Sequence, residues 1–149
     1  MTLKTLFAAL AIVLIPVLAA PAAAEDKEVP NSATVTGAFI LAKDLDSFDD
    51  RVVEIQLFKI HPLLADKAAD LVEKVEIKNF AHTKGTATKK EFVIGAKAKL
   101  EKDMKYYITL FVLNDGKRTH MGGVPDKFLC TVLTQGEPTK VTLTVKPVQ

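Results

Sequence analysis

The sequence predicts an all-β protein, an antiparallel β-sandwich of about seven or eight strands with an immunoglobulin-like arrangement. The first observation behind this prediction is that apolar residues recur with a period of two over most of the chain beyond residue 33, as in half-buried strands. The second is that glycine, proline and aspartate separate the apolar runs, where tight turns are expected. The third is the length, because 149 residues without an internal repeat suffice for one domain and not for two.

The N-terminal segment Met1–Ala24 predicts a secretion signal. It has one positive charge at Lys4, an apolar core at Leu6–Leu18 and small alanines at its end. We expect cleavage between Ala24 and Glu25. The alternative is an uncleaved membrane anchor, which two prolines and a core shorter than about 20 apolar residues disfavour.

The predicted organisation is therefore a signal peptide over residues 1–24, a flexible leader over 25–33 and one β-sandwich domain over 34–149. After cleavage we expect a soluble periplasmic or secreted protein without stable membrane insertion. The whole chain has 20 Lys and Arg against 18 Asp and Glu, a net charge of +2. Because the positive and negative charges nearly cancel, there is no electrostatic reason to expect nucleic acid as a partner.

The strands follow one another at short intervals, each ended by a turn signal. The clearest alternation puts Val53, Ile55 and Leu57 on one face of its strand, and His61-Pro62 ends that strand because proline lacks a backbone donor. The predicted strands are Thr34–Ala42, Arg51–Ile60, Leu71–Lys78, Glu91–Ile94, Tyr106–Asn114, Lys117–Met121, Phe128–Thr134 and Lys140–Lys146.

Two places allow a closer prediction. The segment Leu63–Asn79 fits either a helical stripe or a strand, and we expect a loop or helical turn near Leu63–Ala69 followed by a strand. Asp115-Gly116 lies between two extended runs, which favours a tight hairpin turn with positive φ at both residues. Tyr106, at the start of its strand, fits a tyrosine corner, whose hydroxyl bonds to upstream backbone.

Six short segments between Val35 and Val145 carry a resemblance to a known family. They are Val35-Thr36-Gly37, Val53–Leu57, Glu91–Ile94, Tyr106–Leu110, the turn at Gly116 and Val132–Gly136. On these segments the chain resembles the YbaY-like envelope lipoproteins, whose domain is shared with the pilotin lipoproteins of type III secretion. The resemblance implies a small envelope β-sandwich without known chemistry that binds another protein, as pilotins bind a secretin subunit. The relatives are lipidated, whereas here no cysteine follows the signal.

The candidate binding residues lie on and beside the strand Tyr106–Asn114. Phe111 and Leu113 put apolar side chains on the face opposite to the apolar positions 108, 110 and 112. Either neighbouring loops cover this second face, or it is an exposed stripe that docks a partner. We also consider His120 and Met121 as binding candidates.

The leading functional hypothesis is an exported, non-enzymatic envelope protein that binds another envelope protein through a sheet face or edge. We expect no catalytic residues, no resident metal and no cofactor, and the third hypothesis, a small hydrolase, lacks a sequence motif. The alternative is a periplasmic copper-binding protein that uses His120, Met121 and Met104, with Asp126 and Cys130 as neighbours, because imidazole, thioether and thiolate groups suit copper. We expect Cys130 to be a buried, inert thiol, and the other histidines, His61 and His82, to lie in solvated turns.

Overall fold

The computed structural model describes residues 34–64, 66–127, 129–134 and 137–148. The described part of the chain is all-β, as predicted, and contains eight strands and no helix. Within the same residues, no segment forms a helix of the length and apolarity needed to cross a membrane. The predicted signal, its cleavage between Ala24 and Glu25, and the leader lie outside the described residues.

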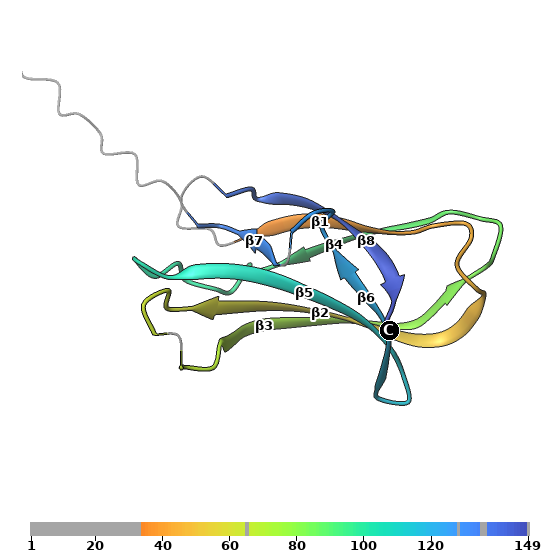
Figure 1. Cartoon of the computed structure of the whole chain (residues 1–149), viewed down its shortest axis with the longest axis horizontal. Helices are drawn as coiled ribbons and strands as arrows, with labels where there is room; N and C mark the ends of the chain where they lie inside the picture. The colour runs from red at the N-terminus through yellow and green to blue at the C-terminus, as the bar shows by residue number, and fades with distance from the viewer. Residues whose placement is uncertain (1–33, 65, 128, 135–136, 149) are drawn as a thin grey trace, which may run out of the picture.

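In chain order the eight strands are β1 (Val35–Leu41), β2 (Phe48–Ile60), β3 (Asp70–His82), β4 (Thr88–Ile94), β5 (Lys105–Asn114), β6 (Lys117–Gly123), β7 (Cys130–Val132) and β8 (Lys140–Pro147). Every predicted strand overlaps one of these, and the ambiguous segment after residue 63 forms turns followed by the strand β3. The strands β2, β3 and β5 run along the long axis of the molecule, whereas β6 and β8 cross it obliquely (Figure 1).

Backbone pairing joins all the strands into one sheet in the order β3-β2-β5-β6-β8-β1-β4, with β7 paired to β5. This sheet curls into a nearly closed, barrel-like shape, so that β3 and β2 lie across from β1 and β4 (Figure 1). A sandwich of two separate sheets is therefore not confirmed. The pairing also differs from the predicted antiparallel scheme at one place, because β1 and β8 run parallel.

The core fills the inside of the curled sheet with apolar side chains from every strand except β6. Phe39 and Phe80 meet edge to face with ring centroids 5.4 Å apart, which joins β1 to β3 across the interior. Gly37 on β1 leaves room for the ring of Phe92, its register partner on β4. The fully buried residues with the largest side chains are Tyr106, Phe39, Leu41, Ile55, Leu57, Ile94, Leu110 and Leu143.

Both local predictions on β5 are confirmed. Asp115 and Gly116 have φ angles of 48° and 77°, as the hairpin turn to β6 requires. The hydroxyl of Tyr106 accepts a hydrogen bond of 2.8 Å from the backbone N–H of Glu101. The predicted strand Phe128–Thr134 is shorter in the structure, since Leu133 adopts a φ of 59° and breaks the extended backbone.

Candidate functional site

The first candidate surface is an apolar strip on the outside of the sheet, made of Val52, Phe111, Leu113 and Met121. Val52 on β2 is the register partner of Leu113 on β5, and Met121 on β6 is the partner of Phe111. These four side chains point away from the core because their strand neighbours Val53, Leu110 and Val112 point into it. Met121 is 47% exposed, and the other three are half-buried.

Charged side chains border the strip and partly cover it. The guanidinium of Arg118 lies 3.8 Å from the centre of the Phe111 ring, a close cation–π contact. Glu54 is the register partner of Phe111 on the β2 side and accepts a bond of 3.2 Å from Lys74. The sequence left open whether loops cover the outer face of β5 or the face is exposed. No loop of the described residues covers Met121 beside it on β6, whereas the Arg118 side chain covers Phe111.

A groove of about 760 Å³ begins at Met121 and continues beyond β6. Its apolar lining includes Val124, Pro125 and Val148, and Val148 is 43% exposed. Met121 belongs to both the strip and this groove, so the two form one continuous apolar surface.

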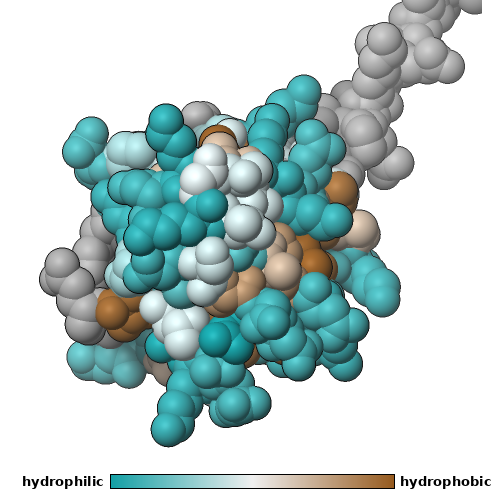
Figure 2. Space-filling view, turned by 90° about the vertical axis from the view of Figure 1, so that its right-hand side faces the viewer, coloured by the Kyte–Doolittle hydropathy of each residue, from teal (hydrophilic) through white to brown (hydrophobic). Residues whose placement is uncertain are grey.

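The second candidate is a groove of about 610 Å³ at the end of the molecule where β2 begins, which we name the end groove. It is lined by Ala42, Asp44, Leu45, Asp46, Ser47, Phe48, Arg51, Thr119, His120, Thr144, Val145, Lys146 and Pro147. Figure 2 looks at this end, where hydrophilic side chains surround a central area of apolar and weakly polar atoms.

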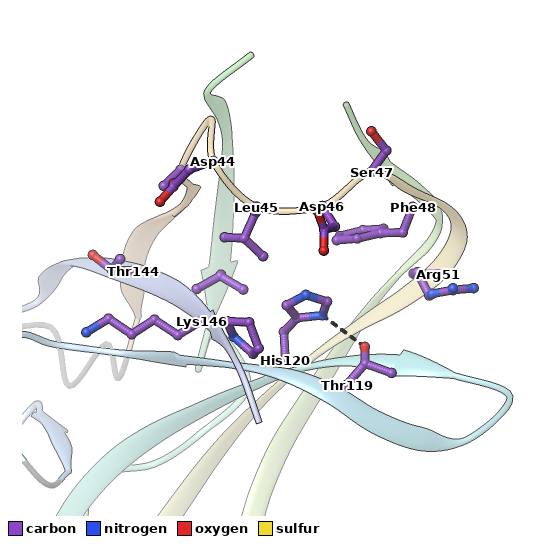
Figure 3. Close-up of a pocket in the computed structure, with 13 residues that line it drawn as sticks. Asp44, Leu45, Asp46, Ser47, Phe48, Arg51, Thr119, His120, Thr144 and Lys146 are labelled. Atoms are coloured by element: carbon purple, nitrogen blue, oxygen red, sulfur yellow. Dashed lines mark hydrogen bonds between the residues drawn. The ribbon is translucent and has the colours of Figure 1, made fainter. Parts of the chain in front are cut away.

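His120 stands inside the end groove, with its ring directed toward Leu45 and Phe48 (Figure 3). The Thr119 hydroxyl donates to the carbonyl of Val112 at 3.1 Å and lies 3.0 Å from Nδ1 of His120. Since a hydroxyl has one proton, Thr119 accepts from Nδ1–H, and neutral His120 keeps its lone pair on Nε2. Burial lowers the pKa of His120, and the charges of Arg51 and His82 lower it further.

His82 does not lie in a solvated turn, so that prediction is wrong. It is the last residue of β3 and is 3% exposed, because a kink at Asn79, with a φ of 53°, turns the end of the strand inward. Its Nδ1 is 2.9 Å from the hydroxyl of Thr88, while its Nε2 is the one buried side-chain polar atom in the described residues without a partner. The Phe48 ring packs against both His82 and His120, at centroid distances of 5.7 and 5.1 Å.

The proposed copper ligands are spread over different surfaces. His120 lines the end groove, Met121 and Asp126 line the groove beyond β6, and Met104 lies near the start of β5 at the opposite end. Cys130 is buried and pairs in register with Ile108, and burial raises the pKa of its thiol to about 11. Among the described residues, no three His, Cys, Asp or Glu side chains come close enough to hold a metal ion.

Both histidine–hydroxyl contacts bear on the hydrolase hypothesis. Thr119 gives its proton to the carbonyl of Val112, so His120 is not positioned as a base for that hydroxyl. The pair of His82 and Thr88 joins the end of β3 to the start of β4, and neither residue belongs to the lining of the end groove.

The strands at the two ends of the sheet order, β3 and β4, each have one edge without a strand partner in the described part of the chain. Side chains bridge the space between them. The carboxylate of Glu73 on β3 accepts a bond of 2.9 Å from the backbone N–H of Gly95 beyond β4, and His82 meets Thr88 at the other end. The sheet is therefore closed by side chains along this line.

Comparison with known proteins supports the fold. No family model matches the chain, and a search of curated proteins finds no match. Among solved structures, the chain is similar to an alternative pilotin from the type II secretion system of Vibrio cholerae, with a TM-score of 0.59 and 20% identity. The similarity covers 78% of this chain and 96% of the pilotin chain. At that identity it shows a common all-β fold, and the YbaY-like resemblance stays a prediction.

Proposed function

We propose that this chain is an exported, non-enzymatic protein of the cell envelope that binds another envelope protein through the strip of Val52, Phe111, Leu113 and Met121. The observation that carries the proposal is the register of these four side chains, which places them side by side on three neighbouring strands. A continuous partly exposed apolar surface on a soluble domain is typical of a docking site.

The geometry of the strip fits a protein partner. Its apolar residues have a polar border of Glu54, Lys74 and Arg118, the usual arrangement of a protein–protein interface. The adjoining groove at Met121 can receive an apolar side chain of the partner, and Arg118 can move from the Phe111 ring to a carboxylate.

Two further arguments concern location and partner. The segment Met1–Ala24 has the composition of a secretion signal, which supports export. The likeness in fold to a type II secretion pilotin makes a subunit of an envelope secretion complex the first partner to test.

Site-specific photo-crosslinking in cells tests the proposal. A benzophenone amino acid replaces Leu113 in one variant and Val93 in a matched control, because Val93 is an apolar strand residue of β4 that is 53% exposed and distant from the strip. We expect a discrete crosslinked envelope protein at position 113 and none at 93. The crosslink should disappear in Met121→Lys and persist in Val93→Lys.

Equal crosslinking at both positions, or a crosslink unaffected by Met121→Lys, would show that the strip is not the docking surface. The thermal unfolding midpoint of each variant is measured as well. Replacing an exposed apolar residue by lysine should change this midpoint by no more than a few degrees.

A further inference from the structure

We propose that the end groove is a second binding site, which takes a small ligand with a carboxylate group and a short apolar body. The carboxylate would lie between Arg51 and Nε2 of His120, and the apolar body against Leu45, Phe48 and Val145. This site is separate from the outer strip and does not depend on the protein partner.

Arg51 is the anchor of the site because its charge is not neutralised. Its Nη1 donates a 2.8 Å bond to the side-chain oxygen of Asn114, a neutral acceptor. Across the described residues, no carboxylate forms an ion pair with Arg51. The half-buried guanidinium therefore has donors available, and carboxylate is the group that its planar fork binds best.

His120 provides a second donor whose direction is fixed. Because Nδ1–H is held by Thr119, Nε2 is the atom that faces a ligand. Protonated His120 donates from Nε2, and a bound anion favours that proton. Binding should therefore weaken as the pH rises through the pKa of His120.

The charged groups around His120 come from four elements. Arg51 lies on β2, His82 on β3, Asp44 and Asp46 in the loop before β2, and Lys146 on β8. Asp46 lies between Leu45 and Phe48 above the His120 ring (Figure 3), and Lys84 binds its carboxylate at 2.8 Å and also attracts Asp44, which reduces the repulsion of an anion by the two acids.

The groove also has an apolar wall and a suitable size. Figure 3 shows Leu45 and Phe48 on the side toward which the His120 ring points, with Arg51 on one side and Lys146 on the other. A volume of about 610 Å³ lies within the range of small-ligand sites. A ligand with only a charge would leave this apolar wall uncovered, so we expect an alkyl or similar group next to the carboxylate.

NMR titration with hexanoate tests the site, with the ring protons of His120 as the reporter. We expect hexanoate to shift the His120 resonances saturably, and to bind about tenfold or more tightly than acetate or hexanol. Arg51→Gln should weaken binding about tenfold, whereas the control Lys105→Gln, an exposed cation at the start of β5 and outside the end groove, should not. Binding at about pH 6 should exceed that at about pH 8.

A short peptide ending in leucine, with a free or an amidated C-terminus, distinguishes a chain end from a fatty acid as the source of the carboxylate. Tighter binding of the free peptide than of hexanoate assigns a chain end, and the reverse assigns a fatty acid. Unchanged His120 resonances in the wild-type protein at saturating hexanoate, or equal binding of hexanol, would overturn the proposal, as would equal binding by Arg51→Gln.

Discussion

Gly37→Ala tests the packing that joins β1 to β4. A Cβ atom at position 37 would lie 2.2, 2.6 and 2.8 Å from three ring carbons of Phe92, whereas carbon atoms in contact prefer about 3.5 to 4.0 Å. The ring is 5% exposed and is part of the core, so it cannot retreat into solvent without losing its burial.

The expected cost follows from these distances. Overpacking of a core costs about 1 to 3 kcal/mol, and the upper end applies here because the new Cβ is fixed to the backbone and the Phe92 ring is enclosed by the core. The smaller entropy of the unfolded alanine chain offsets less than about 1 kcal/mol of it. We therefore expect Gly37→Ala to lower the free energy of unfolding by about 2 kcal/mol, measured by urea denaturation with an unchanged slope.

Gly123→Ala is the matched control, because it makes the same change on a strand where nothing lies within 4 Å of the new Cβ. We expect its stability to stay within about 1 kcal/mol of the wild type. Combining Gly37→Ala with Phe92→Leu should give less destabilisation than the sum of the two single changes. Equal stability of the two alanine variants, or strict additivity with Phe92→Leu, would refute this account of the β1–β4 contact.

Three other predictions follow from the described contacts. Tyr106→Phe removes the bond from Glu101 N–H and should cost about 1 kcal/mol in urea denaturation, while Tyr107→Phe, which has no such bond, should cost less. Cys130, whose pKa is raised to about 11, should react with a thiol reagent at neutral pH only after unfolding, and fast labelling of the folded protein would contradict its burial. Because the pKa of His120 is lower in the folded state than its ordinary value near 6.5, its neutral form favours folding, so this contribution to stability is full above that value and is lost as the pH falls below it. His120→Gln should make the stability loss on acidification shallower, and an identical acid profile would speak against the shift.

Local patterns in the sequence predict the strands but not how they pair. The alternation in β2 and β8 and the Asp115-Gly116 turn depend on neighbouring residues, so they can be read directly. The parallel pairing of β1 with β8 joins residues about a hundred positions apart, and no local feature encodes it. Curling into one nearly closed sheet also depends on such distant pairings.

The burial of His82 shows a more specific limit. The predicted strand stops at Lys78 because alternation fails there: Ile77 and Phe80 both face inward at a spacing of three. The cause is the β-bulge at Asn79, whose positive φ restores the inward direction for Phe80 and His82. The sequence signal for this bulge was Asn79, which lies between the apolar residues Ile77 and Phe80 at an odd spacing. The end groove has no such signal in the sequence, because its lining residues come from β2, β6, β8 and a loop that are distant from one another along the chain.

The free edges of β3 and β4 also explain why we place partner binding on the sheet face. An open edge accepts an added strand only if its backbone groups are accessible and its side chains permit a close approach. Here lysines lie along both edge strands, at Lys74 and Lys78 on β3 and at Lys89 and Lys90 on β4, and their exposed charges oppose an added apolar strand. Glu73 occupies the N–H of Gly95, which a partner's carbonyl would otherwise bind. The outer strip has no comparable obstruction at Met121, so a partner can dock there while both edges remain as they are.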